Sequence, residues 1–374
     1  MRHTPLYQAH LDAGARMVEF AGWAMPIHYG SQIDEHHAVR RGSGMFDVSH
    51  MCPVEVRGPQ ARAYLLRLLA NDVGKLQSRG KALYSCMLNG DGGIIDDLIC
   101  YRLADDHFRV VVNAGARDNA LDWMAINSEE FDADVVAMRD YGMIAVQGPE
   151  ARGKVTVLLA PEHRGTADEL EPFSAAQVAA PGGELFVART GYTGEDGFEI
   201  IAPEAATRPL WDALMSSGVK PCGLGARDSL RLEAGMNLSG QDMDESVTPL
   251  ESGLGWTVAM DGDRAFIGRE ALEAYKARGV DCRFTGLVLA GRGVLRHGQT
   301  VRTDSGEGVI SSGGFSPTLE RAIALARLPA GDEDRCEVDI RGRWLEARIV
   351  RPPFVRFGKA SAKMQVVLDC FAGG

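Results

Sequence analysis

Three acidic residues of this 374-residue chain stand where acids are uncommon, inside apolar runs that predict β-strands. Asp96 and Asp97 interrupt the run 94–101, and Glu199 has an apolar residue on either side. Aspartate is depleted in strands, and a carboxylate against an apolar wall costs free energy unless something pairs with it. These three side chains are therefore the first candidates for binding or catalysis.

The two aspartates lie in a predicted hairpin. The segment 81–101 contains two apolar runs, and Asn89-Gly90 and Gly92-Gly93 between them tolerate the positive φ of a tight connection. Because neighbouring residues in a strand point to opposite faces, at most one of Asp96 and Asp97 can face a given pocket. The other is expected to face solvent or to cap a backbone group. The spacing leaves open the alternative that both are exposed charges on an edge strand.

Glu199 follows a glycine-rich turn at 191–194 and shares the segment 195–199 with two further acids. Like Asp97, it belongs to a strand-like run, but in a different part of the chain. Two carboxylates from two units could converge on one ligand that carries ring N–H groups. An amino-pyrimidine edge can give a carboxylate two hydrogen bonds, so a pterin is a physical match.

Arg227 is a candidate for binding an anion. It lies in the segment Gly-Leu-Gly-Ala-Arg-Asp at 223–228, where a glycine-rich turn opens a predicted helix. A helix N-terminus can bind an anion, and a guanidinium can give a carboxylate two hydrogen bonds. The alternative, a structural ion pair of Arg227 with Asp228 or Glu233, has equal standing on spacing alone.

Other kinds of site find little support in the sequence. The segment 223–228 lacks the third glycine of a GxGxxG nucleotide fingerprint, and the chain has no GxSxG motif. His36 and His37 are adjacent, about 100° apart on a helix, and so rarely share a metal ion. A helix face at a domain or subunit contact is their expected role. We expect neither a metal nor a nucleotide cofactor.

Composition and charge are typical of a globular enzyme. Hydrophobic residues make up 45% of the chain and charged residues 24%, with a formal net charge of −11. An acidic chain argues against nucleic acid as the main partner, and no apolar run is long enough to span a membrane. The seven scattered cysteines show no CxxC spacing, and the start of the chain has no apolar signal core. We therefore expect a cytoplasmic protein.

The apolar runs divide the chain into α+β units followed by a β-rich end. Segments 54–59 and 143–149 both predict a strand and a turn that lead into a helix, which is a faint internal repeat. After residue 283, short apolar runs alternate with glycines, which predicts a small barrel or sandwich. The strands expected there are 285–289, 309–312, 323–328, 337–340 and 345–350.

Motifs spread over nearly the whole chain resemble the aminomethyltransferase, or T-protein, family of the glycine cleavage system. The matching runs are TPLY at 4–7, FAGW at 20–23, GMFDVSHM at 44–51, GKALYS at 80–85, GGIIDDL at 92–98, GYTGE at 191–195, GLGARDSLRLEAG at 223–235, GQDMDE at 240–245 and FSPT at 315–318. The resemblance implies an α+β fold with three domains in a cloverleaf around a central folate site. The implied parts are a discontinuous first α+β domain of 1–50 and 141–247, a second, ferredoxin-like α+β domain of 51–140, a connector of 248–280 and a C-terminal β-barrel of 281–374.

The resemblance also implies a reaction. The methylene carbon of an aminomethyl group on lipoylated H-protein would pass to tetrahydrofolate, giving 5,10-methylenetetrahydrofolate, ammonia and dihydrolipoyl H-protein. Asp97 is the implied catalytic residue, placed near N-10 of the folate. Glu199 would hold the pterin edge, and Arg227 the folate tail or the pocket mouth. The other implied folate contacts are Met51, Tyr84, Val111, Asn113, Tyr192 and Arg356.

The resemblance implies H-protein as the partner, and the charge pattern leads to the hypothesis that Arg292 and its neighbours dock it. Four arginines gather in the sequence near the predicted start of the barrel, at 283, 292, 296 and 302. Within an acidic chain they could bind an acidic partner protein. The alternative is a solvated face without a binding role.

Two features qualify the resemblance. Ser239 stands where many relatives carry tyrosine, and Met236 stands where an aromatic residue can occur, so neither receives a role.

An alternative function is that of superfamily members that act in iron–sulfur assembly or RNA modification. They carry a cysteine in a Lys-Gly-Cys motif before the Gly-Gln pair, whereas the run 234–241 of this chain contains no cysteine.

Overall fold

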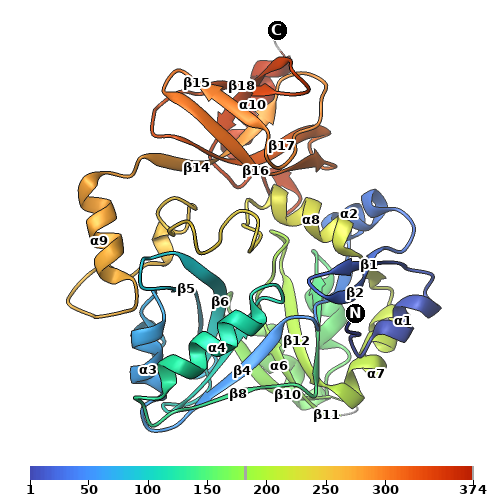
Figure 1. Cartoon of the computed structure of the whole chain (residues 1–374). Coiled ribbons are helices and arrows are strands. Elements are labelled where there is room, and N and C mark those ends of the chain that lie inside the picture. The colour runs from blue at the N-terminus through green and yellow to red at the C-terminus, as the bar shows by residue number, and fades with distance from the viewer. Residues whose placement is uncertain (181–182, 373–374) are drawn as a thin grey trace.

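Three lobes surround the middle of the molecule, and each is built on its own β-sheet (Figure 1). The computed structural model describes residues 1–180 and 183–372. Two lobes are mixed α+β, and the third, at the top of Figure 1, is a closed six-stranded barrel formed by the C-terminal part of the chain. The predicted fold class is thereby confirmed. The last two residues of the predicted barrel domain, 373–374, lie outside the described residues.

The first lobe contains a six-stranded sheet in the order β10-β11-β12-β9-β3-β13. Only the short strand β3 comes from the start of the chain, and the others follow residue 140. The strands are β3 (Gly44–Asp47), β9 (Tyr141–Gln147), β10 (Ala175–Ala180), β11 (Gly183–Ala188), β12 (Gly197–Pro203) and β13 (Lys220–Pro221). The other elements of this lobe are α1 (Tyr7–Asp12), β1 (Arg16–Phe20), β2 (Trp23–His28), α2 (Gln32–Arg41), α5 (Ala151–Thr156), α6 (Pro161–Asp168), α7 (Glu204–Ser216) and α8 (Leu224–Glu233).

The second lobe contains a five-stranded sheet in the order β5-β6-β7-β4-β8. Its strands are β4 (Cys52–Arg57), β5 (Ala82–Leu88), β6 (Ile94–Arg102), β7 (His107–Val112) and β8 (Asp134–Ala137). The helices α3 (Ala61–Leu68) and α4 (Arg117–Ser128) supply buried residues to its core, and a short turn of 3-10 helix lies at Val73–Lys75. The predicted hairpin of 81–101 is present as the antiparallel pair β5–β6.

The faint repeat between 54–59 and 143–149 corresponds to a repeated local structure. The strand β4 leads through Gly58 into α3, and β9 leads through Gly148 into α5. Both glycines have positive φ, 134° and 126°, and a Cβ on either would lie within 2.4 Å of a backbone oxygen. Because only glycine fits such a close approach, the two strand–turn–helix units share a physical requirement as well as a sequence pattern.

The barrel contains the five predicted strands and one more. Its strands are β14 (Cys282–Leu289), β15 (Thr300–Thr303), β16 (Gly306–Ser316), β17 (Arg321–Pro329), β18 (Arg335–Asp339) and β19 (Trp344–Val350). The additional strand is β15, whose four residues include only one apolar side chain and therefore gave no strand signal. A small hairpin of β20 (Val355–Arg356) and β21 (Lys359–Ala360) and the helix α10 (Ala362–Ala372) follow the barrel.

The predicted connector runs along the chain from the first lobe to the barrel and packs against the second lobe. It contains a turn of 3-10 helix at Gly255–Thr257 and the helix α9 (Arg269–Arg278). We keep the predicted domain limits as a proposal, which the division of the strands among three sheets supports. Within the part of the chain that the structure describes, no helix is both long and apolar enough to cross a membrane.

A buried polar cluster joins the barrel to the first lobe. The carboxylate of Glu233, at the end of α8, accepts hydrogen bonds from Arg40 of α2 and from Ser316 and Thr318 of the barrel lobe. His36 lies 3.3 Å from the same carboxylate and hydrogen-bonds the hydroxyl of Thr318 at 3.0 Å. We call these five residues the Glu233 cluster. His36 thus has the predicted role at a contact between domains.

Candidate active site

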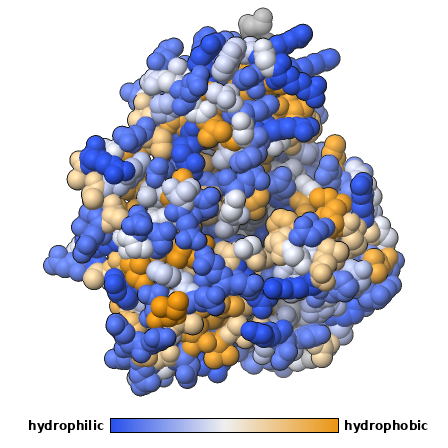
Figure 2. All heavy atoms as spheres, viewed as in Figure 1, coloured by the Kyte–Doolittle hydropathy of each residue, from blue (hydrophilic) through white to orange (hydrophobic). Residues whose placement is uncertain are grey.

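A cavity of about 790 Å³ lies where the three lobes meet. Both α+β sheets, the loop that follows α8 and the segment after the barrel contribute to its wall. The surface on the face shown in Figure 2 is mainly hydrophilic, with apolar patches scattered over it. The predicted site residues that line the cavity are Met51, Tyr84, Asp97, Val111, Asn113, Tyr192, Glu199 and Arg227.

The pairing of three adjacent strands explains why the second lobe presents these side chains together. Cys86 of β5 lies opposite Asp97 of β6, and Tyr84 lies opposite Ile99, which in turn lies opposite Val111 of β7. Residues that face each other across an antiparallel pair share one face of the sheet, as do residues two apart in a strand. Tyr84, Asp97 and Val111 therefore project from the same face into the cavity.

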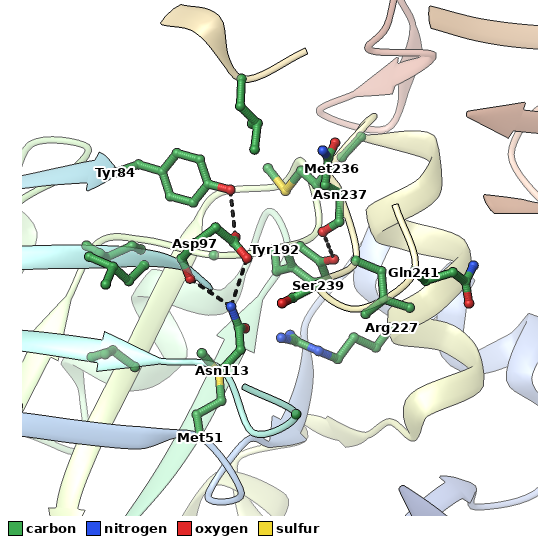
Figure 3. Close-up of a pocket in the computed structure, with 18 of the residues that line it drawn as sticks. Met51, Tyr84, Asp97, Asn113, Tyr192, Arg227, Met236, Asn237, Ser239 and Gln241 are labelled. Atoms are coloured by element: carbon green, nitrogen blue, oxygen red, sulfur yellow. Dashed lines mark hydrogen bonds between the residues drawn. The ribbon is translucent and has the colours of Figure 1, made fainter. Parts of the chain in front are cut away.

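Asp97 is held by two hydrogen bonds (Figure 3). Its Oδ2 accepts a hydrogen bond from the Tyr84 hydroxyl at 2.6 Å, and its Oδ1 accepts one from Nδ2 of Asn113 at 2.9 Å. Burial raises the pKa of Asp97, these hydrogen bonds oppose the rise, and the resulting pKa is about 6. The carboxylate is thus fixed in direction and titrates close to neutral pH, which suits a group that stabilises positive charge or exchanges protons.

Asp96 does not line the cavity and is fully buried on the other side of the strand. It accepts hydrogen bonds from the backbone N–H of Asn113 at 2.9 Å and from Nδ2 of the same residue at 2.8 Å. It therefore caps a backbone group, one of the two predicted roles. The alternative of two exposed edge charges is wrong, because β6 lies between β5 and β7.

Glu199 reaches the cavity from β12 of the first lobe and is 6% exposed. One of its oxygens accepts a hydrogen bond from the Thr190 hydroxyl at 2.6 Å. Among the described residues, Thr190 is the one hydrogen-bond donor to the Glu199 side chain. Since an ionised carboxylate can accept about four hydrogen bonds, Glu199 keeps most of its capacity for a ligand.

Arg227 reaches the cavity from the first turn of α8, and its guanidinium lies 4.5 Å from the centre of the Tyr192 ring. The structural alternative is wrong, because Asp228 pairs with Arg231 and Glu233 pairs with Arg40. Among the described residues no hydrogen bond or ion pair to the Arg227 side chain is present. Burial lowers the pKa of Arg227, although the residue remains charged at neutral pH.

Two predicted residues lie outside the cavity. Arg356 is exposed, with its guanidinium 5.5 Å from the centre of the Phe357 ring, although the nearby Pro353 lines the cavity. A contact with a ligand would require Arg356 to turn or the ligand to extend past the rim. Arg292 is exposed on the barrel lobe.

The four arginines around residue 292 separate into two kinds. Arg283 pairs with Glu333, and Arg302 pairs with Glu337 and lies over Trp344. Arg292 and Arg296 are exposed and have no ion pair to another described residue. Only the latter two are therefore free to bind a partner.

Several cavity residues were not predicted. Trp256 comes from the connector, is 69% exposed and stacks on Tyr84 with ring centres 5.6 Å apart. No sequence pattern of the connector pointed to it. Further unpredicted lining residues are His50, Phe173, Met236, Asn237, Ser239, Gln241 and Arg351. His50 and Gln241 belong to motifs that carried the family resemblance, which was the one available signal.

Comparison with known proteins defines the class of this fold and site. Residues 6–262 match the family model described as the GCVT N-terminal domain. Residues 283–356 match the model described as the glycine cleavage T-protein C-terminal barrel domain. The two matches cover the α+β lobes and the barrel, so the whole architecture is that of a glycine cleavage T-protein.

Individual relatives agree. An aminomethyltransferase of Xanthomonas oryzae pv. oryzae is 57% identical over 358 residues, which cover 96% of this chain and 97% of that protein. One of Xylella fastidiosa is 56% identical over 360 residues, covering 96% and 98%. The crystal structure of the glycine cleavage system aminomethyltransferase T from Bartonella henselae superimposes with a TM-score of 0.87 at 33% identity, covering 96% and 99%. The chain belongs to the aminomethyltransferase family of the glycine cleavage system and is a transferase.

Proposed function

We propose that this enzyme transfers the methylene carbon of an aminomethyl group from the lipoyl arm of H-protein to tetrahydrofolate. The observation that carries the proposal is the cavity itself, where two carboxylates from different lobes face one space with an arginine that has no acidic partner among the residues described. A reduced folate offers ring N–H groups to carboxylates and a carboxylate tail to arginine. The name of the relatives, aminomethyltransferase, supports an aminomethyl group as the unit transferred.

The reaction balances without an oxidant. The methylene carbon loses its bonds to sulfur and to the amino nitrogen and gains bonds to N-5 and N-10 of the folate. The two protons released from those nitrogens pass to the departing amine, which leaves as ammonia, and to the sulfur, which becomes the thiol of dihydrolipoyl H-protein. The product is 5,10-methylenetetrahydrofolate.

Asp97 is proposed as the catalytic residue. Its carboxylate would hydrogen-bond a folate nitrogen near N-10 and stabilise the positive charge that develops as the carbon is transferred. Tyr84 and Asn113 hold the carboxylate in one direction before the substrate arrives, so little reorganisation is needed. A pKa of about 6 keeps Asp97 mostly ionised at neutral pH and still able to take up a proton.

Glu199 and Arg227 are proposed to bind the two ends of the folate. Glu199 would accept hydrogen bonds from the amino-pyrimidine edge, since most of its acceptor capacity is unused. Arg227 would contact the tail carboxylate or the cavity mouth. Met51, Val111 and Tyr192 would form the wall around the ring, and Arg356 would contribute at the rim.

Lipoylated H-protein is the proposed partner. The barrel lobe offers Arg292 and Arg296 on a chain that is otherwise acidic, so an acidic partner could be attracted to this surface. Electrostatic attraction of this kind mainly raises the rate of association, and it should weaken as ionic strength increases.

Ammonia release from aminomethyl-lipoyl H-protein tests the proposal. Release should require both tetrahydrofolate and the lipoylated protein, and 5,10-methylenetetrahydrofolate should form in equal amount. Omitting tetrahydrofolate and replacing H-protein by its unlipoylated form are the controls. Absence of tetrahydrofolate-dependent ammonia release from the folded enzyme would refute the proposed function.

A further inference from the structure

His50 is the one cavity-lining residue with a fully buried polar atom that lacks a partner, as far as the described residues go. The side chain is only 3% exposed, and its Nδ1 accepts and donates no hydrogen bond. Its Nε2 also has no hydrogen-bond partner among the described residues but does not belong to the fully buried atoms. Because His50 lines the cavity and its Nδ1 is fully buried, we infer that Nε2 is the ring nitrogen that faces a ligand.

The fold holds this imidazole in place without using its nitrogens. The backbone of the preceding residues is fixed, since Val48 donates to the carbonyl of Met143 at 2.9 Å and the Ser49 N–H donates to Asp47 at 2.9 Å. The ring packs edge-to-face against Phe20, with ring centres 5.6 Å apart. A side chain that is fixed in direction but unpaired is typical of a preorganised binding group.

The protonation state of His50 determines whether its ring donates or accepts a hydrogen bond in the cavity. Burial lowers the pKa of His50, the Asp47 charge opposes this, and Arg227 lowers it further, so the pKa is about 4 and the ring is neutral at neutral pH. A neutral ring has one N–H. Buried N–H groups without partners are rarer than buried acceptors without partners, so the proton belongs on Nε2. His50 therefore presents a donor to the cavity.

The cavity is thus divided by hydrogen-bonding character. Asp97 and Glu199 are acceptors, whereas His50 and Arg227 are donors. His50, Arg227 and Glu199 line the same cavity, and the charge of Arg227 affects the pKa of His50. A ligand that fits must present an acceptor oxygen next to its N–H groups.

We propose that His50 is a further substrate-binding residue, whose Nε2–H donates a hydrogen bond to an acceptor oxygen of the folate beside Arg227. This inference rests on the proposed function, since it names a contact of the same co-substrate. The oxygen belongs either to the carbonyl of the pterin ring or to the tail carboxylate. Both are acceptors next to N–H groups, and the experiment below separates them.

The test measures binding by calorimetry with two ligands, tetrahydrofolate and 6-methyltetrahydropterin, which lacks the tail. His50→Leu removes the donor, and His50→Gln keeps an N–H near the position of Nε2. Loss of one hydrogen bond should raise the Kd for tetrahydrofolate about 3- to 10-fold in His50→Leu, with most of the affinity restored in His50→Gln. His163→Leu, the same change in α6 outside the cavity, is the matched control and should leave the Kd unchanged.

The response of the pterin identifies the oxygen. If His50→Leu raises the Kd for 6-methyltetrahydropterin by the same factor as the Kd for tetrahydrofolate, the ring carbonyl is the acceptor. If the Kd for 6-methyltetrahydropterin stays constant, the tail carboxylate is the acceptor. Thermal unfolding of the free protein separates binding from structure, because removing an unpaired buried polar group should leave the melting temperature unchanged or higher. Unchanged tetrahydrofolate affinity in His50→Leu would overturn the inference, as would a loss that accompanies a lower melting temperature and is not restored in His50→Gln. Failure of the unaltered enzyme to bind tetrahydrofolate would instead refute the proposed function.

Discussion

Glu233 and Glu199 are both buried carboxylates, yet their surroundings differ. Arg40, His36, Ser316 and Thr318 surround Glu233, so its acceptor capacity is filled by the protein. Glu199 has one donor, and the neighbouring Arg227 has no acid partner among the described residues. Of these two carboxylates, the one whose acceptors the protein fills joins the barrel to the first lobe, and the one that keeps free acceptor capacity lines the cavity.

Removing Glu233 should have the largest effect, and the effect should be on stability. Glu233→Ala removes one of the two carboxylates that pair with buried Arg40, the other being Glu195, and leaves the hydroxyls of Ser316 and Thr318 without their acceptor. These losses together should lower the free energy of unfolding by about 3–5 kcal/mol. Urea denaturation monitors this change. Glu337→Ala breaks the exposed barrel pair with Arg302 and is the matched control, with an expected loss below about 1 kcal/mol. Equal losses in the two variants would contradict the structural role of the Glu233 cluster.

Replacing Asp97 should slow transfer without lowering the stability of the protein. Asp97→Asn keeps the shape but removes the charge, and transfer should fall by roughly 10²-fold or more with the Kd for folate changed far less. Stability should not fall at neutral pH, because a buried carboxylate with a raised pKa destabilises the folded state there. Rapid-quench transfer assays and thermal unfolding give the two values. Near-normal turnover of this variant would refute the catalytic role of Asp97.

Removing the unpaired arginine should affect binding more than chemistry. Arg227→Ala removes the guanidinium that we propose donates a charge-assisted hydrogen bond to the folate, so the Kd should rise roughly 10- to 100-fold while the rate of the bound complex changes less. Calorimetry and single-turnover kinetics separate the two quantities. An unchanged folate affinity would reject the role of Arg227 and, with it, the link between unpaired groups and ligand binding.

As the pH falls, the enzyme should lose activity before it loses the stability that the Glu233 cluster contributes. In the proposed mechanism transfer needs ionised Asp97, whose pKa is about 6, so kcat/KM should fall about tenfold between pH 7 and pH 5. Burial alone would raise the pKa of Glu233, but His36 and Arg40 outweigh it and lower the pKa to about 2. Its stabilisation is therefore complete above its ordinary pKa of 4.5 and is lost only as the pH falls from there toward 2.

Stability and activity measured on the same samples check this order. At pH 5 the protein should be folded, by circular dichroism and urea denaturation, but slow in transfer. Loss of structure in parallel with loss of activity between pH 7 and pH 5 would contradict the separation of the two regions.

The smallest effect is expected at the docking surface. Arg292→Glu and Arg296→Glu reverse exposed charges that no internal pair requires, so the KM for H-protein should rise severalfold at low salt while kcat stays constant. Arg335→Glu, an exposed barrel arginine beside Glu346, is the matched control. If neither variant changes the KM for H-protein, this surface does not dock it.

Local geometry made part of the site predictable. Strand alternation required Asp96 and Asp97 to face opposite ways. Tyr84 came from the family resemblance, and the observed register of the hairpin places it beside Asp97. The sequence could not select between the two aspartates, since that choice depends on which face of the sheet the other lobes cover. The family motif selected Asp97, and its place in the cavity wall agrees.

Long-range contacts account for what the sequence could not predict. Arg40 and Glu233 are 193 residues apart, and Trp256 reaches Tyr84 from a connector without a recognisable pattern. Whether a polar side chain stays unpaired is also a property of its surroundings in space. Spacing therefore left the role of Arg227 open and gave His50 none, whereas the folded structure distinguishes both from the paired residues of the Glu233 cluster.

A crystal structure with bound 5-methyltetrahydrofolate would show directly whether the cavity is the folate site. We expect the ring inside the cavity, with Glu199 at the amino-pyrimidine edge and the Asp97 carboxylate within hydrogen-bond distance of a nitrogen near N-10. A folate bound elsewhere, or one in this cavity that leaves Asp97 and Glu199 without contact, would contradict the proposed function.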